Sequence, residues 1–280
     1  MNPEKLENPK SLNTNTNNEA KKKKTLLIAS GVAGLLLLIG AGIGIFYLLT
    51  HVSAEDYRRA DTRLTEMRRA NTAMVNDVSS LSRSITSATS DTFDEKLNDA
   101  RDSLDTLKSE NEALAKEKAV RFGEGADLYK AFNDKAQTYA VYVDELISSV
   151  DKIRPAMEPC QKIGKSSVEV DDRASTVDAC VTELEKAGEL PNAEFNRYFG
   201  ALKGKYATYG DLYQRYNKLT SPLGSQRAEY IEIRDKTNAV LAEIRTLRTD
   251  FIRDLNDRDK ETSLKDVFDD LRGYLKEQRA

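Results

Sequence analysis

Apolar residues after position 53 recur at alternating spacings of three and four, the pattern of the a and d positions of a coiled coil. The first run consists of Tyr57, Ala60, Leu64, Met67, Asn71, Met74, Val78, Leu81 and Ile85. The second run consists of Phe93, Leu97, Ala100, Leu104, Leu107, Asn111 and Leu114. The pattern therefore predicts two long amphipathic helices.

The stretch between the two runs, residues 86–92, is small and polar and predicts a turn. A chain folded back at residue 89 brings the a positions of one helix against the d positions of the other, as in an antiparallel hairpin. In this register Asn71 and Asn111 lie in neighbouring layers, where their amides would hydrogen-bond and fix the alignment. Ser53 and Asp56 resemble a capping box and predict the start of the first helix.

A third run with the same spacing extends over residues 129–153. Before it, Gly123 and Gly125 loosen or end the second helix, because glycine is a weak helix former. After it, Pro155 and Pro159 predict the end of the third helix, because proline lacks the backbone N–H that a helix interior requires.

The chain after residue 50 is expected to have three parts. Residues 51–154 form a three-helix, coiled-coil-like unit, residues 155–190 a connector, and residues 191–280 a second helical bundle. The helices expected in the second bundle span residues 191–220, 225–259 and 263–278. Ser263 and Asp266 again resemble a capping box.

A run of 24 residues without a charge, Leu26 to Leu49, precedes these helices. A helix of that length spans about 36 Å, more than the hydrocarbon core of a bilayer, which is about 30 Å thick. We therefore predict a transmembrane anchor over residues 25–50. A signal peptide cleaved near Ala54 is the alternative, but the apolar part of such signals is only about 7 to 15 residues long. The expected fold class is all-α, a single transmembrane helix followed by an extended extracytoplasmic helical bundle with coiled-coil-like antiparallel helices.

Positive charges flank the apolar run unequally. The lysines that adjoin its N-terminal end are Lys21, Lys22, Lys23 and Lys24. The arginines on the other side are mixed with acidic residues, so the positive-inside rule predicts a cytoplasmic N-terminus and an extracytoplasmic chain after His51. Residues 1–24 are expected to be a disordered cytoplasmic tail, whose lysine cluster contacts anionic head groups as an anchor stop. The expected location is the cell membrane, with a single pass.

Gly40 and Gly44 form a GxxxG motif inside the expected span. One interpretation is close helix–helix packing and a homodimer in the membrane. The other interpretation, which we favour, is the ordinary glycine content of transmembrane helices.

The only two cysteines, Cys160 and Cys180, both lie in the part of the chain that is expected to be exported. An even pair outside the cytosol predicts one disulfide. The bond would close a loop of about twenty residues and contribute about 3 kcal/mol to stability. With one histidine and no third cysteine, the chain has too few ligands for a structural zinc site.

Seven aromatic residues fall on one face of the helix expected after Pro191, within an arc of about 100°. They are Phe195, Tyr198, Phe199, Tyr206, Tyr209, Tyr213 and Tyr216. One interpretation is a partner-binding stripe that forms a groove for a peptide, a glycan or a partner helix. The other, which we favour, is the core-facing side of an amphipathic helix, with one or two tyrosine hydroxyls reaching solvent.

Composition and motifs exclude several classes of function. Charged residues make up 32% of the chain, but acids and bases are interleaved and the net charge is −3, so nucleic acid is not an expected partner. Phosphate-binding, metalloprotease, hydrolase and dinucleotide motifs are all absent from the sequence. We therefore expect no catalytic residues, no metal and no cofactor, and no motif assigns the chain to a known family.

These features predict a non-catalytic, membrane-anchored protein that binds a macromolecular partner in the cell envelope or at the cell surface. One alternative is a ligand-sensing ectodomain that acts through a membrane partner, because a cytoplasmic tail of about 24 residues is too short to signal by itself. The other is a structural scaffold or spacer. A pocket lined by the tyrosines would favour a sensor, a filled bundle a scaffold, and an exposed aromatic patch a partner-binding protein.

Overall fold

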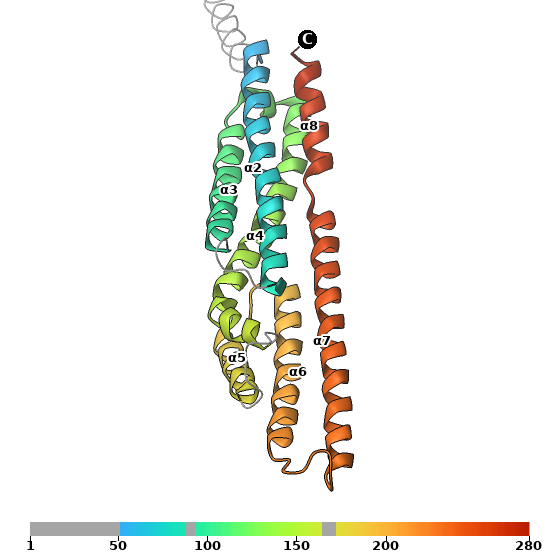
Figure 1. The fold of residues 1–280 in the computed structure, drawn as a ribbon. Coiled ribbons are helices and arrows are strands. Elements are labelled where there is room, and N and C mark those ends of the chain that lie inside the picture. Colours follow the sequence, from blue (N-terminus) through green and yellow to red (C-terminus); the bar gives the residue numbers. More distant parts are fainter. Residues whose placement is uncertain (1–50, 88–92, 164–171, 280) are drawn as a thin grey trace, which may run out of the picture. The chain divides into compact units, whose positions relative to one another are not determined.

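The computed structural model describes residues 51–87, 93–163 and 172–279 (Figure 1). All regular structure in these ranges is helical, which confirms the all-α class. The helices are α2 (Ala54–Ser87), α3 (Phe93–Leu114), η1 (Lys118–Val120), α4 (Gly123–Lys162), α5 (Arg173–Ala187), α6 (Ala193–Asn217), α7 (Arg227–Thr262) and α8 (Lys265–Glu277).

None of the helices in the described ranges is both long and apolar enough to cross a membrane. The tail expected over residues 1–24 and the span expected over residues 25–50 lie outside the described residues. Of the turn predicted over residues 86–92, residues 86 and 87 belong to α2 and residues 88–92 lie outside the described residues. Also outside the described residues are those of the lysine cluster and the GxxxG motif, which are Lys21, Lys22, Lys23, Lys24, Gly40 and Gly44. Residues Ser53–Ala280 form one compact unit, called the helical unit below.

The capping box at the start of α2 is confirmed. The backbone N–H of Asp56 donates to the Ser53 hydroxyl (3.2 Å), and the backbone N–H of Ser53 donates to the Asp56 carboxylate (2.9 Å). These bonds satisfy N–H groups that have no partner within the helix. The bond from the Ser53 backbone is also the main reason why the pKa of the Asp56 carboxyl lies below its ordinary value.

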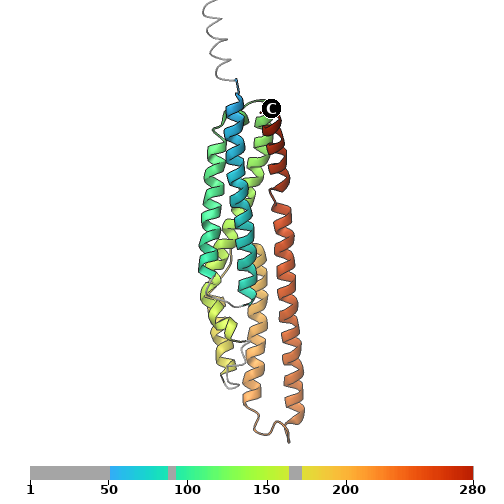
Figure 2. The ribbon, with the colours of Figure 1, turned by 45° about the horizontal axis from the view of Figure 1, so that its top comes forward.

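The two heptad runs form α2 and α3, which lie side by side along their length (Figures 1 and 2). Six of the seven a and d residues of α3 are buried, and so are most of those of α2. The predicted bond between Asn71 and Asn111 is wrong. The Asn111 amide donates instead to Asn133 on α4 (2.7 Å), and the Asn71 carbonyl oxygen is buried without a hydrogen-bond partner. Asn111 therefore makes its polar contact with a third helix, α4, and not with α2 as expected.

The predicted stop of the third helix at Pro155 and Pro159 is also wrong, because α4 continues through both prolines to Lys162. Pro155 and Asp151, the residue whose carbonyl loses its partner, are both exposed, so solvent can replace the missing bond. Burial of Ile153 and Ala156 on the other face offsets the remaining cost. The boundary expected at residues 154 and 155 consequently falls inside a helix.

The C-terminal helix α8 packs against α2 and α4, at the end of the helical unit that contains Ser53 (Figure 1). The rings of Phe132 and Phe268 meet edge to face with centroids 4.9 Å apart, and both side chains are buried. The rings of Tyr57 and Tyr274 lie 6.0 Å apart. Helices from the first and the last expected parts of the chain thus share one core.

Three helices in the C-terminal part follow their expected ranges to within a few residues. The second capping box is wrong, since the Ser263 hydroxyl accepts from the backbone N–H of Lys265 (3.3 Å) rather than from Asp266. Leu264 precedes α8 without a side-chain cap. The connection between α6 and α7 lies at the opposite end of the helical unit from Ser53 (Figures 1 and 2).

Candidate ligand-binding site

The aromatic stripe lies on α6, whose first turn is anchored to α4. Asn192 caps the helix, because its side-chain oxygen accepts from the backbone N–H of Phe195 (3.1 Å). The backbone N–H of Asn192 donates in turn to the hydroxyl of Ser149 on α4 (2.9 Å), and both residues are buried. This polar contact fixes where α6 begins relative to α4.

The first half of the stripe is part of the core. Phe195 and Tyr198 are buried, and Tyr198 stacks on Phe251 of α7 with ring centroids 4.3 Å apart. Burial raises the pKa of the Tyr198 hydroxyl. Phe199 and Tyr206 are half-buried and pack against Ala156, Cys180 and Leu184. The core-facing interpretation therefore holds for this half.

The second half of the stripe lines a groove of about 360 Å³ between α5, α6 and α7. We call it the tyrosine groove and define it by Tyr209, Tyr213 and Tyr216 on α6, Tyr230 on α7 and Arg173 on α5. The remaining residues that line it are Leu212, Ile233, Arg234, Thr237, Asn238 and Leu241. Of the five tyrosines in the predicted stripe, Tyr198 and Tyr206 do not line the groove.

The four tyrosine rings follow one another along the groove. Their centroids are 4.8 Å apart for Tyr209 and Tyr213, 6.3 Å for Tyr213 and Tyr216, and 6.2 Å for Tyr216 and Tyr230. Tyr209 is only 4% exposed, and burial raises the pKa of its hydroxyl. The other three rings are half-buried. One ring therefore anchors the row in the core, and the next three present aromatic surface to the groove.

Arg173 supplies the positive charge of the groove. One of its terminal nitrogens donates to the Tyr213 hydroxyl (2.8 Å), and its guanidinium carbon lies 5.6 Å from the centroid of that ring. The hydrogen bond to Tyr213 is the main reason why the pKa of Arg173 is raised. Its Nε is buried without a hydrogen-bond partner, and among the described residues no carboxylate pairs with it. Arg234, by contrast, is paired with Asp235 at 2.8 Å.

Helix α5 holds Arg173 against α6 through a close packing contact. A Cβ atom at Gly210 of α6 would lie 3.2 Å from a methyl carbon of Val177, so the glycine allows the two helices to approach. Val177 is buried together with Tyr209, Leu212 and Ile233, and these side chains form the floor below the groove. A larger side chain at position 210 would require the Val177 side chain to shift.

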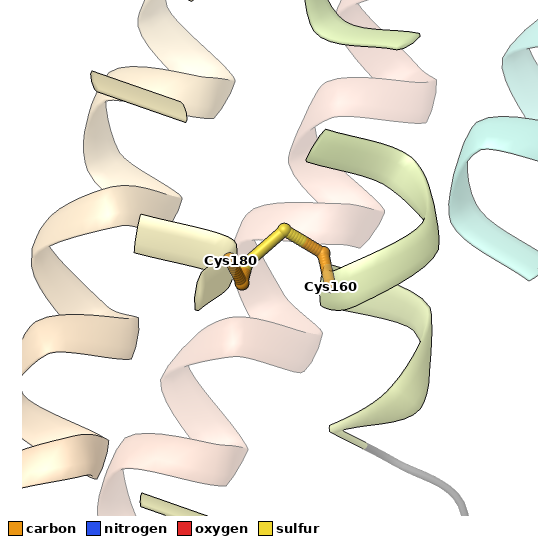
Figure 3. Close-up of a disulfide and its surroundings, with 2 residues drawn as sticks. All are labelled: Cys160 and Cys180. Atoms are coloured by element: carbon orange, nitrogen blue, oxygen red, sulfur yellow. A yellow bond between two sulfur atoms is a disulfide. The ribbon is translucent and has the colours of Figure 1, made fainter. Parts of the chain in front are cut away.

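The predicted disulfide between Cys160 and Cys180 is confirmed (Figure 3). It joins α4 to α5, with the two Cα atoms 4.7 Å apart. Cys180 is fully buried against Ala156 and Leu184. The bond lies one and a half to two turns of α5 beyond Arg173. It therefore ties the helix that carries Arg173 to the rest of the helical unit.

The sequence pattern did not identify Arg173, Tyr230 or Asn238 as residues of the groove. Tyr230 shares the spacing of Ile233 and Val240 on α7, which indicated only that it faces a partner helix. Arg173 is on a different helix from the tyrosines, and no local signal connects the two. In the described part of the chain no set of three or more histidine, cysteine or acidic side chains is arranged to hold a metal ion.

No protein family, no characterised protein and no solved structure matches this chain at a significant level.

Proposed function

We propose that this chain is a single-pass, membrane-anchored protein whose extracytoplasmic helical unit captures a protein partner through the tyrosine groove. The observation that carries the proposal is the row of four tyrosines beside Arg173. Tyrosine and arginine are the residue types most enriched at the energetic centres of protein interfaces. No step of catalysis is proposed.

The chemistry of the groove favours a segment with a carboxylate. The Arg173 guanidinium has one buried N–H without an acceptor, and no acidic side chain of the described residues neutralises its charge. Arg173 as a whole is only half-buried, so an acidic side chain of a partner would supply the missing negative charge. The half-buried rings of Tyr213, Tyr216 and Tyr230 would cover the apolar part of the same segment.

The membrane anchor and the topology of the proposal depend on the sequence. The uncharged run over residues 26–49 is long enough to span a bilayer, and the lysines at positions 21–24 favour a cytoplasmic N-terminus. The Cys160–Cys180 disulfide supports this topology, because such bonds persist in oxidising compartments. The groove is lined by the last turns of α6 and the first turns of α7, and the connection between these helices lies at the end of the helical unit opposite the start of α2 (Figure 1).

The topology can be tested by adding protease to intact cells from which any wall has been removed. Residues 53–280 should be degraded while a tag on the N-terminal tail is spared. Protection of the helical unit with cleavage of the tail would reverse the proposed topology. A soluble mature chain that begins near Glu55 would show that the apolar run is a signal peptide.

Partner capture can be tested with a photo-crosslinking phenylalanine analogue placed at Tyr216 in cells. The control is the same analogue at Ala207, which is exposed on α6 outside the groove. We expect a protein adduct at Tyr216 only, and a crosslinked peptide that contains an acidic residue. Equal adducts at both positions would contradict a specific groove.

The role of Arg173 can be tested with the crosslinked segment as a synthetic peptide. Arg173→Gln should weaken peptide binding about tenfold or more, since removing one partner of a desolvated charge pair mainly raises the dissociation rate. Arg253→Gln is the matched control, because Arg253 is exposed on α7 and paired with Asp250 away from the groove. Equal affinity of the wild type and Arg173→Gln would refute the proposed carboxylate contact.

A ligand-sensing ectodomain is the second candidate function. The observation that favours it is the volume of the groove, about 360 Å³, which lies within the range of small-molecule pockets, about 300–1,000 Å³. The crosslinking experiment separates the two candidates, because an adduct with the mass of a small molecule at Tyr216 would indicate a sensor.

A further inference from the structure

A second concave site lies where α2, α4 and α7 meet. The charged residue that lines it is an acid, Asp259, whereas the charged residues that line the tyrosine groove are bases. We call it the junction pocket. Its volume is about 340 Å³. The residues that line it are Val75, Val78 and Ser79 of α2, Tyr142 of α4, and Ile252, Leu255, Asn256 and Asp259 of α7. It shares no residue with the tyrosine groove and stands independently of the function proposed for that groove.

The walls of the junction pocket are mainly apolar. Val75 of α2 and Ile252 of α7 are half-buried, and Leu255 of α7 is buried. The ring of Tyr142, 6% exposed, forms the wall contributed by α4. Such walls favour a ligand with an apolar body, because each buried CH₂ group contributes about 0.8 kcal/mol in transfer from water.

The polar group that distinguishes the pocket is the carboxyl group of Asp259. It is half-buried, and burial alone raises its pKa above the ordinary value. Among the described side chains its carboxylate takes part in no ion pair and no hydrogen bond; the bond from the Thr262 hydroxyl (3.5 Å) goes to its backbone carbonyl. No cation among the described residues therefore offsets the free-energy cost of partly desolvating this carboxylate.

The neighbouring charges on α7 are already paired with one another. Arg258 forms an ion pair with Glu261 at 3.1 Å, and Lys260 forms one with Asp257 at 3.1 Å. The guanidinium carbon of Arg258 lies 5.9 Å from the centroid of the Tyr142 ring. On α4 and α6 the titratable groups that influence this site are Tyr139, Tyr142 and Glu194, none of which is a cation. Among the described side chains, none that is basic pairs with the half-buried Asp259 carboxylate.

We propose that the junction pocket binds a small organic cation, an alkylammonium compound whose charged nitrogen contacts Asp259 and whose alkyl groups pack against Val75 and Ile252. The Tyr142 ring supplies a further apolar wall for the alkyl groups of the ligand. The Asn256 amide can orient a polar substituent of the ligand. A bare metal ion does not fit this site, because Mg²⁺ and Ca²⁺ require about six or more oxygen ligands and one carboxylate stands among apolar walls.

The proposal can be tested with the oxidised full-length protein in non-ionic detergent micelles. Choline is the probe, and 3,3-dimethylbutan-1-ol is its neutral analogue of nearly the same shape. Choline should raise the melting temperature saturably at millimolar concentration, and the neutral analogue at the same concentration should not. Sodium chloride at equal ionic strength controls for a general salt effect.

Two variants and one control variant assign the effect to the junction pocket. Asp259→Asn should abolish the choline-dependent shift, whereas Asp257→Asn should retain it, because Asp257 is exposed and does not line the pocket. Val75→Lys places an ammonium group inside the pocket and should also abolish the shift. Equal shifts in the wild type and Asp259→Asn would overturn the proposal, as would the absence of any saturable shift in the wild type or an equal shift with the neutral analogue.

Discussion

Reduction of the Cys160–Cys180 disulfide should lower the free energy of unfolding of the helical unit by about 3 kcal/mol. The two cysteines are 20 residues apart in the sequence, and the chain-entropy relation gives about this value for a loop of that length. Reduction removes no heavy atom from either cysteine, so it does not empty the site beside Ala156 at the same time. For a unit of about 150 to 250 residues, 3 kcal/mol corresponds to a fall in melting temperature of about 6 to 12 °C.

The assay is urea unfolding of the full-length protein in detergent micelles, followed by far-ultraviolet circular dichroism with and without a phosphine reductant. The double variant Cys160→Ala/Cys180→Ala is the control, and the reductant should change nothing in it. A reduced wild type that unfolds at the same urea concentration as the oxidised protein would refute the loop-closure argument. A loss well above about 5 kcal/mol would refute it too, because it exceeds what loop closure supplies.

Reduction should also have a local effect on the tyrosine groove. The disulfide attaches α5 to α4, and α5 carries Arg173. Amide hydrogen exchange should therefore become faster across residues 173–187, while exchange across α3, which has no contact with the disulfide, stays unchanged. Equal acceleration in both helices would mean that the bond stabilises the helical unit globally and does not specifically hold Arg173.

Three further predictions concern single side chains. Tyr209→Ala should lower the free energy of unfolding by about 3 to 5 kcal/mol, because it empties a buried site. Tyr216→Ala should lower it by less than about 1.5 kcal/mol, because its ring is only half-buried, and should mainly reduce partner capture. Chemical denaturation measures the first effect and peptide binding the second. Asp259→Asn should raise the free energy of unfolding at pH 7 but not at pH 3. Burial raises the pKa of Asp259 in the folded state, so the cost of burying its charge appears only as the pH rises above the ordinary value of 3.8. Equal gains at both pH values would contradict this assignment. Burial raises the pKa of Tyr274 to about 12 from its ordinary value of 10.0, so the stability that depends on its neutral hydroxyl is complete below pH 10.0 and is lost as the pH rises to about 12. Tyr274→Phe should therefore make alkaline unfolding, followed by circular dichroism, less steep over that interval. An unchanged profile would contradict this assignment.

The parts of the fold that could be predicted from the sequence depend on local periodicity. The spacing of Leu97, Leu104 and Leu107 predicts one apolar face, and that face is buried in α3. The capping box at Ser53 was predictable for the same reason, because its two partners are three residues apart. Neither conclusion requires knowledge of which helices are neighbours.

The errors occur where a contact with a distant helix overrides a local rule. Proline at position 155 normally ends a helix, but the buried residues Ile153 and Ala156 and the bond at Cys160 hold α4 together across it. Asn111 was assigned to the wrong partner because its register was judged from one hairpin, whereas the structure adds α4 as a third helix.

Contacts between distant helices also limit how much of the candidate site could be predicted from the sequence. The aromatic stripe on α6 was visible in the sequence, but its division into a buried half and a half that lines a groove is set by α5 and α7. Arg173 precedes Tyr213 by forty residues, and only the folded chain brings them within hydrogen-bond distance. The junction pocket likewise combines three helices and has no motif in the sequence.

The contact of α8 with the start of α2 has a consequence for engineering. Arg272 and Arg279 each lie 3.5 Å from the Asp61 carboxylate, and Tyr274 meets Tyr57, so positions 53 and 279 belong to one end of the helical unit. A polypeptide can therefore enter and leave the unit at neighbouring points, which is the geometry that makes domains tolerant of insertion into other proteins. The unit could be transplanted into a surface loop of a host protein, where it would present the tyrosine groove at its far end without opening the host fold.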